Sequence, residues 1–318
     1  MYLLFISNQL IISKLKHILF AAKNYFMTTK DIFISLALMA LWGFNFSVIK
    51  LGAMQVDPIL LTALRFTFAV IPAIFFVRRP PEAIGFLIAY GLIFGLGVWG
   101  MMVWSINLGV SAGMAGLLMD MSIISSLVLG YMLFKEAITF NKILGAVLAV
   151  SGLLASLALT DGSVPLRALP LTLIAACSWS LMSVVVKKSK TKHVFAFSVW
   201  GMLFAPLPLV LFAYAFNGIQ PFVDLPAQLN SQVWFSILFQ AYPTTLLGYW
   251  IWNRLTVKYP LSTMAPFTLL TPIFGLIGSV IFYHEGVSPM KLLAYALILG
   301  GLLVSQWQPK KVPVVIGH

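Results

Sequence analysis

Long apolar stretches separated by short polar joints run along almost the whole chain. A helix that crosses a bilayer needs about 20 mostly apolar residues, and most of these stretches are close to that length. Glycine, proline and charged residues gather at the joints, as is typical of helix ends. The pattern predicts an all-α membrane protein with about ten transmembrane helices. They cover residues 31–50, 57–77, 84–105, 110–134, 143–159, 166–186, 194–216, 232–253, 262–283 and 289–307.

The composition excludes a water-soluble domain. Hydrophobic residues make up 61% of the chain and charged residues 9%, with a mean hydropathy of +0.99, whereas about a quarter of a soluble domain is charged. The net charge of +12 does not indicate a nucleic-acid partner, because the basic residues lie at helix ends and not on one patch. The single cysteine, Cys177, leaves no intrachain disulfide and no cysteine-based metal cluster.

The distribution of basic residues predicts the orientation. If the N-terminus is cytoplasmic, 16 of the 20 lysines and arginines lie on the cytoplasmic side, Lys50, Arg167 and Lys291 on the other, and Arg65 inside the second helix. This is a positive-inside pattern, and it places both termini in the cytoplasm. Residues 1–29 are read as a leader or a mis-called N-terminal extension, since Met27 is a plausible start, with a surface-lying helix as the alternative. Residues 310–318 form a cytoplasmic tail.

The two halves of the chain resemble each other. The run from Trp42 to Lys50 is similar to the run from Trp179 to Lys187, 137 positions later, and the stretch 145–156 is similar to 294–305. We therefore predict two five-helix units, residues 30–159 and 160–309. A repeat with an odd number of helices is inverted in the membrane, and inverted repeats with a site near the bilayer midplane are typical of secondary transporters.

These residues carry a family resemblance. The run from Trp42 to Phe46, the triplet Leu64-Arg65-Phe66 and the run from Pro72 to Arg78 resemble EamA-type transporters of the drug/metabolite transporter superfamily, and in particular their O-acetylserine/cysteine exporter branch. The resemblance covers residues 30–307. It implies ten helices, cytoplasmic termini, the bacterial inner membrane and export of amino acids or related metabolites. Asp120 departs from the family pattern, in which an uncharged polar residue is expected.

Asp120 and Arg65 are the two charges placed deep within predicted helices. A charge at a helix centre costs about 2.5–3.5 kcal/mol on insertion scales, so we expect each of the two residues to have a partner or a function. Asp120 is a candidate proton carrier or a contact for a substrate ammonium group; the alternative is an ion pair with Arg65. For Arg65, anchoring at the interface or pairing is favoured over binding a substrate carboxylate. Lys50 and Lys187 occupy equivalent helix ends and are interpreted as boundary anchors, with gate residues as the alternative.

Uncharged polar and aromatic residues at membrane depth complete the candidate site. An amide such as Asn45 must find partners in a neighbouring helix or a wet cavity. Trp42 and Trp179 are symmetry mates away from the aromatic belt, suited to line a cavity or simply to pack. The further candidate substrate contacts are Trp99, Gln240 and Tyr249. Prolines inside predicted helices indicate kinks, and one frees a carbonyl near the predicted site: Pro206, Pro208, Pro243, Pro266 and Pro272.

The favoured function is a secondary active transporter that exports amino acids or related small metabolites by alternating access. The predicted helices 1, 3, 4, 6, 8 and 9 line its cavity. The sequence has no ATP-binding or zinc-protease motif, so we expect no enzyme, no cofactor and no metal. The expected partners are a small metabolite, the lipid bilayer and a proton. A drug or sugar-phosphate carrier is the alternative, although phosphate calls for several cavity cations; a non-transporting membrane scaffold comes after it.

Overall fold

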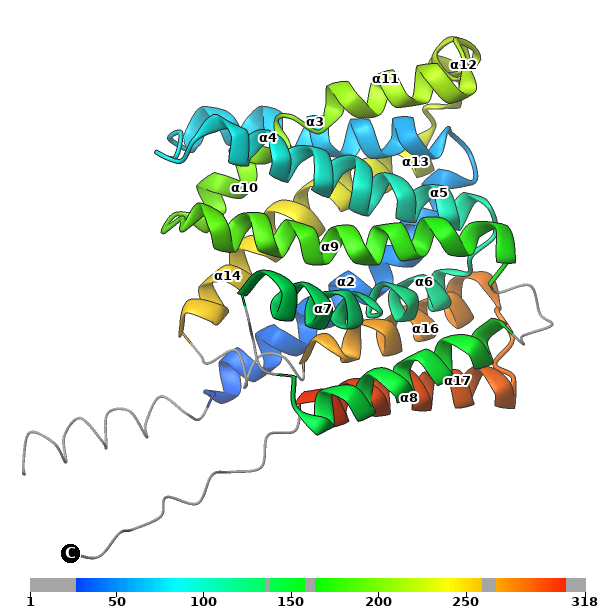
Figure 1. Cartoon of the computed structure of the whole chain (residues 1–318). Coiled ribbons are helices and arrows are strands. Elements are labelled where there is room, and N and C mark those ends of the chain that lie inside the picture. The colour runs from blue at the N-terminus through cyan, green and yellow to red at the C-terminus, as the bar shows by residue number, and fades with distance from the viewer. Residues whose placement is uncertain (1–26, 135–137, 158–163, 259–266, 307–318) are drawn as a thin grey trace, which may run out of the picture.

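The structure is a bundle of helices. The computed structural model describes residues 27–134, 138–157, 164–258 and 267–306, and these residues form helices and no strand (Figure 1). The leader and the C-terminal tail lie outside the described residues, except for positions 27–29, and so does Pro266. The elements are α2 Thr29–Ala53, α3 Pro58–Phe76, α4 Ile84–Leu92, the π-helix η1 Ile93–Gly100, α5 Met101–Asn107, α6 Ala112–Met119, α7 Ser122–Phe134, α8 Phe140–Leu157, the 3-10 helix η2 Leu166–Ala168, α9 Leu169–Ser189, α10 Val194–Met202, α11 Pro206–Asn217, α12 Gln220–Gln228, α13 Ser231–Phe239, the π-helix η3 Gln240–Leu247, α14 Gly248–Lys258, α16 Leu270–Tyr283 and α17 Pro289–Gln306.

The helices are those of a multi-pass membrane protein. Six helical spans in the described residues are long and apolar enough to cross a bilayer: Thr29–Ala53, Pro58–Phe76, Ile84–Asn107, Ala112–Leu133, Leu166–Ser189 and Val194–Asn217. Shorter apolar helices cover Phe140–Ser156, Leu270–Tyr283 and Pro289–Ser305. Large apolar side chains face outward, with Phe75 80% and Phe76 87% exposed, as lipid contact favours. The predicted all-α membrane class is confirmed.

Local chemistry explains several helix boundaries. Asp57 begins α3, because its Oδ1 accepts hydrogen bonds from the backbone N–H groups of Ile59 and Leu60, and Pro58 occupies the first helical position, where no N–H is needed. Ser111 caps α6 in the same way by accepting from the N–H of Met114. The turn before it uses Gly109 at φ 113°, a conformation that glycine adopts without strain.

Two predicted helices are interrupted, and one predicted loop is helical. The predicted helix 110–134 is broken between α6 and α7 at Asp120, where backbone bonds of shorter range replace the α-helical ones. The predicted helix 194–216 breaks before Pro206, since a proline cannot supply an N–H to the preceding turn. The predicted loop 217–231 contains α12, an amphipathic helix with a hydrogen bond from Gln220 to Asp224 on one face.

Helix α2 runs through the middle of the bundle and packs closely on α16 (Figure 1). A Cβ atom built on Gly43 would lie 2.4 Å from Cβ of Phe274 and 2.6 Å from the carbonyl oxygen of Thr271, so this crossing requires glycine. Such small-residue contacts are typical of membrane helices. Helices α8 and α17 form a tight pair at the edge of the bundle (Figure 1). The close α2–α16 contact fixes one wall of the central cavity.

Candidate functional site

A cavity of about 240 Å³ lies at the centre of the bundle. It is lined by residues of the predicted helices 1, 3, 4, 6, 8 and 9, and by Arg65 from α3. Of the predicted site residues, seven line it: Trp42, Asn45, Arg65, Trp99, Asp120, Trp179 and Tyr249. The described residues hold no group of three histidine, cysteine, aspartate or glutamate side chains that could bind a metal ion. The site is therefore built from aromatic faces, a few amides and hydroxyls, and two charges.

Arg65 is a buried cation, and one nitrogen of its guanidinium group has no hydrogen-bond partner. Its side chain is 1% exposed, so it does not reach the membrane surface, and the predicted anchoring role does not fit. Its Nε and one terminal nitrogen donate to the hydroxyl of Thr245, at 3.2 and 2.9 Å. Its Cζ atom lies 4.1 Å from the ring centre of Trp99, in cation–π contact. The other terminal nitrogen, Nη1, has no hydrogen-bond partner.

Asp120 is a carboxylate at a helix break. It caps the C-terminus of α6, two residues before α7 begins. Its Oδ2 atom is buried without a hydrogen-bond partner, and no ion pair joins it to Arg65 in the part of the chain that the structure describes. The predicted alternative, a structural Arg65–Asp120 pair, is thus absent; the two groups share a cavity and do not neutralise each other directly.

Asn45 supplies a third polar atom without a partner. This residue lies mid-way along α2 and is 2% exposed, and its Oδ1 accepts no hydrogen bond. Polar groups at this depth are costly unless they are satisfied. With the indole N–H of Trp99, the cavity-lining residues thus hold two buried donors and two buried acceptors that have no partner.

The tryptophans form part of the cavity wall. Trp42 donates from Nε1 to the backbone carbonyl of Thr244, at 3.0 Å, within the π-helix that contains Pro243. Its ring centre lies 5.5 Å from that of Tyr249. Trp179 lines the cavity from α9, and its ring packs on Phe94 with centres 6.4 Å apart. Both tryptophans therefore line the cavity, and each also packs on aromatic neighbours.

Three predicted residues lie away from the cavity lining. Gln240 is fully buried at the start of η3, where its Nε2 donates to the hydroxyl of Ser236 and its carbonyl accepts from Thr244 and Thr245. Its role is to hold η3, so the predicted substrate contact is not supported by its position. Lys187 lies in the last turn of α9, and Lys50 forms an ion pair with Glu285.

Hydroxyl side chains of the cavity were missed in the sequence. Ser122, Ser126 and Ser183 line it from α7 and α9, and Thr268 and Thr271 from the start of the α16 segment. Ser122 and Ser126 are four residues apart, so they lie on the same face of α7, and that spacing was the available signal. Serine and threonine are common at helix contacts in membranes, which is why the signal is weak without a structure.

Comparison with known proteins places this geometry in a family. The sequence model of the EamA-like transporter family matches the chain twice, over residues 29–158 and 166–306. The chain is 32% identical over 285 residues to a probable amino-acid metabolite efflux pump of Salmonella typhimurium, covering 88% of this chain and 95% of that protein. It is 30% identical over 285 residues to a protein of the same description in Escherichia coli K12, with the same coverage.

A solved structure has a similar fold. A crystal structure of a protein superposes with a TM-score of 0.58 at 18% sequence identity, and covers 88% of this chain and 98% of that one. At this identity the likeness concerns the fold alone. The matches agree with the predicted class, a transporter and not an enzyme. With both family matches together spanning most of the sequence, the chain belongs to the EamA-like transporter family.

Proposed function

We propose that the chain is a secondary active transporter that exports a neutral amino acid, or a related zwitterionic metabolite, through the central cavity. The observation that carries this proposal is the set of buried polar atoms without a partner on residues that line the cavity: Arg65 Nη1, Trp99 Nε1, Asp120 Oδ2 and Asn45 Oδ1. A substrate carboxylate suits Nη1 of Arg65, because guanidinium–carboxylate hydrogen bonds are charge-assisted. A substrate ammonium group suits Asp120 and Asn45, which offer acceptors only at these atoms.

The charges of the cavity favour a substrate without net charge. Arg65 and Asp120 are its one cation and one anion among the described lining residues. An amino acid with an acidic or basic side chain would bring one more charge into an apolar cavity without a partner, which is costly. A sugar phosphate would need further cations beside Arg65. These considerations favour a zwitterion over the alternative carriers of the superfamily.

The size of the cavity supports a small substrate. Its volume of about 240 Å³ lies below the range of about 300–1,000 Å³ that is common for drug-sized ligands. The two bacterial relatives described as probable amino-acid metabolite efflux pumps point the same way. Trp42, Trp99, Trp179 and Tyr249 would then enclose the apolar part of the substrate.

We further propose ten transmembrane helices in two inverted five-helix repeats, in the bacterial inner membrane with both termini cytoplasmic. Two matches of the same family model, over 29–158 and 166–306, support the repeat. So do the eight-residue π-helices η1 and η3, which occur in the third and the eighth predicted helix. The excess of lysine and arginine at the end where α2 begins supports the orientation.

Uptake into inside-out membrane vesicles tests the function. Vesicles containing the protein should accumulate a neutral radiolabelled amino acid when a proton gradient is imposed, and should take up aspartate and lysine at least about tenfold more slowly, because each lacks a partner for its extra charge. Vesicles with the Asp120→Asn protein are the control. Uptake of neutral and charged amino acids at equal rates, or none under any ion gradient, would refute the proposal.

The same vesicles test the proton partner. If Asp120 carries the coupling proton, Asp120→Asn abolishes the dependence of uptake on the proton gradient. If Asp120 binds only the substrate ammonium group, the variant loses affinity but the residual uptake keeps its pH dependence. The second outcome would remove the proton role and leave the substrate role in place.

A further inference from the structure

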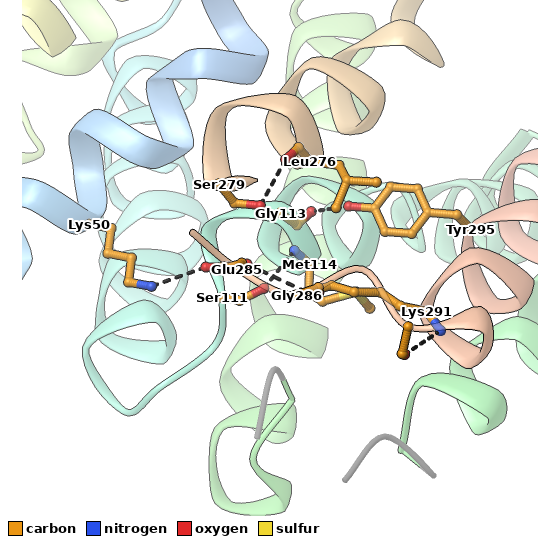
Figure 2. Close-up of polar contacts among 11 residues, drawn as sticks. Lys50, Ser111, Gly113, Met114, Leu276, Ser279, Glu285, Gly286, Lys291 and Tyr295 are labelled. Carbon is orange, nitrogen blue, oxygen red and sulfur yellow. Dashed lines mark hydrogen bonds and ion pairs between the residues drawn. The ribbon is translucent and has the colours of Figure 1, made fainter. Parts of the chain in front are cut away.

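A cluster of charged residues closes the bundle at the end where α2 terminates (Figure 2). Lys50, in the last turn of α2, donates from Nζ to Oε1 of Glu285 at 3.0 Å. Nζ of Lys291, on α17, lies 3.5 Å from Oε2 of the same carboxylate. Ser111, which caps α6, further stabilises the charged form of this carboxylate. One carboxylate therefore joins α2, α17 and the α16–α17 connection.

This cluster is shielded from water. The side chain of Lys291 is 0% exposed and that of Glu285 11%, so each charge depends on its partners. Burial disfavours the ionised form of Glu285, but hydrogen bonds from Lys50 and Ser111 and the positive charges of Lys50 and Lys291 outweigh it. The pKa of this carboxyl is therefore held below its ordinary value of 4.5. The ion pairs are consequently formed at neutral pH.

Contacts around the cluster seal the same end. The ring of Tyr283 lies under Nζ of Lys50, 4.3 Å from its centre, and the Tyr283 hydroxyl donates to the carbonyl of Ser47 at 2.7 Å. The hydroxyl of Tyr295 donates to the carbonyl of Gly113, so α17 is also tied to α6 (Figure 2). Both hydroxyls bond backbone carbonyls across helices, so the charged cluster and these aromatic contacts form one layer.

The layer lies directly beyond the central cavity. Asn45 and Phe46 of α2 line the cavity, and Lys50 follows Asn45 by five residues, or about 7.5 Å along a helix. The rings of Phe46 and Trp99, with centres 6.4 Å apart, both line the cavity. The part of the cavity that Ser183 lines extends away from this layer. Ser183 follows Trp179 along α9, and α9 runs antiparallel to α2 (Figure 1).

We propose that the Lys50–Glu285 ion pair is the gate that closes the transport cavity toward the outer face, and that Lys291 keeps Glu285 paired when the gate opens. Opening the cavity through this layer would separate Lys50 from Glu285, which lie on different segments. Lys291 follows Glu285 by six residues through a short connection, so it moves with the carboxylate. The opening therefore breaks one ion pair and leaves no buried carboxylate unpaired, which limits its cost. The gate rests on the proposed function only in taking the cavity as the transport path.

A second ion pair offers a matched control. Asp31, at the other end of α2, pairs with Lys258 at the end of α14. Asp31 and Lys50 are 19 residues apart, or about 28 Å along a helix, close to the thickness of the hydrocarbon core. Both pairs fasten α2 to another helix, but only the Lys50 pair should control access from outside.

Thiol labelling from the outer side tests the gate without any substrate. Cys177, the single cysteine of the sequence, is first replaced by serine. Ser47→Cys then places a reporter of similar size on α2, between the cavity-lining Asn45 and the gate residue Lys50 along the helix, at a position that packs on Gly278 and is 3% exposed. The rate of reaction with a membrane-impermeant maleimide is measured in intact cells. We expect Glu285→Gln and Lys50→Gln each to raise this rate about tenfold, the factor that corresponds to losing a charged hydrogen bond.

One further variant makes the result decisive. Asp31→Asn, which removes the matched pair at the other end of α2, should leave the rate unchanged. Rates unaffected by Glu285→Gln and Lys50→Gln, or raised equally by Asp31→Asn, would overturn the gate. If Glu285→Gln fails to fold, Lys50→Gln, whose parent side chain is 21% exposed, carries the same test. A working gate in a protein that moves no amino acid would refute the proposed substrate alone.

Discussion

Replacing Arg65 by glutamine tests the substrate site most directly. Arg65 is 1% exposed and holds two of its nitrogens on the hydroxyl of Thr245. Its third nitrogen, Nη1, is buried without a hydrogen-bond partner, on a residue that lines the cavity. Glutamine keeps a donor toward Thr245 but removes the positive charge and the unpartnered nitrogen Nη1. The change therefore removes the proposed carboxylate contact and retains much of the packing.

The expected magnitude follows from this geometry. A hydrogen bond to a charged group contributes about 1.5–3 kcal/mol, so loss of the Nη1–carboxylate contact should weaken substrate binding by about 10- to 150-fold. The folded protein should not lose comparable stability, because Arg65 has no ion pair among the described residues that the change would break. Removal of one partner from a buried ion pair would instead cost about 3–5 kcal/mol.

Binding of an amino acid and of its decarboxylated amine separates the carboxylate contact from general damage. Calorimetry on the purified protein in detergent should show that the wild type binds the amino acid more tightly than the amine by the factor above. The Arg65→Gln protein should bind both ligands with similar affinity. Arg65→Lys is the matched control: it keeps the charge but loses the planar fork, so its preference should be intermediate.

An equal loss of affinity for the amino acid and for the amine would refute this reasoning. If Arg65→Gln weakens the amino acid and the amine by the same factor, Arg65 supports the shape of the cavity and does not bind the carboxylate. An unchanged affinity for both would show that the substrate lies elsewhere.

Further predictions concern the ammonium contact, the helix packing and the charged layer. Asp120→Asn should weaken an amino acid about tenfold in the same calorimetry but leave the corresponding acid without its amino group unaffected. Gly43→Ala should lower the unfolding free energy by about 1–3 kcal/mol in thermal denaturation, because its methyl group would meet Phe274, whereas Gly300→Ala, with nothing within 4 Å, should not. Glu285 is partly buried, and its hydrogen bonds and neighbouring lysines keep its pKa below 4.5 in the folded protein. The stability lost in Glu285→Gln should therefore be constant from about pH 8 to 5, and it should shrink as the pH falls from the ordinary pKa through the lowered one, because the unfolded carboxyl takes up its proton first.

The membrane class and the outline of the helices followed from composition and periodicity, because an apolar run of fixed length has few alternatives in lipid. The breaks inside helices did not follow so well. Pro206 correctly marked one of them, whereas Asp120 looked like a mid-helix charge and proved to be the end of α6. A helix that ends at membrane depth depends on partners from other helices, and a local pattern does not contain them.

The sequence indicated residues of the candidate site but not their contacts. Trp42, Asn45 and Asp120 line one cavity, and polar groups at membrane depth could be recognised from the sequence because they are rare there. Gln240 has the same composition signal but serves a π-helix. Arg65 was expected to anchor or pair, since its depth is visible in the sequence but its partner is not. The hydroxyl of Thr245 reaches it from 180 residues away.

The two π-helices explain why Arg65 can be held without a counter-ion. In η3 the hydroxyl of Thr245 donates to the carbonyl of Gln240 five residues earlier, and its oxygen then accepts both bonds from Arg65. In η1, Trp99 places its ring 4.1 Å from the guanidinium carbon. A π-helical segment is less favourable than an α-helix and is found mainly at functional sites. Each half of the chain therefore contributes one such segment to the same cation, and together they hold it beside the cavity with Nη1 left without a partner. A carboxylate bonded to Nη1 would be the strongest partner that Arg65 can gain, which is why we propose that the substrate carboxylate binds there.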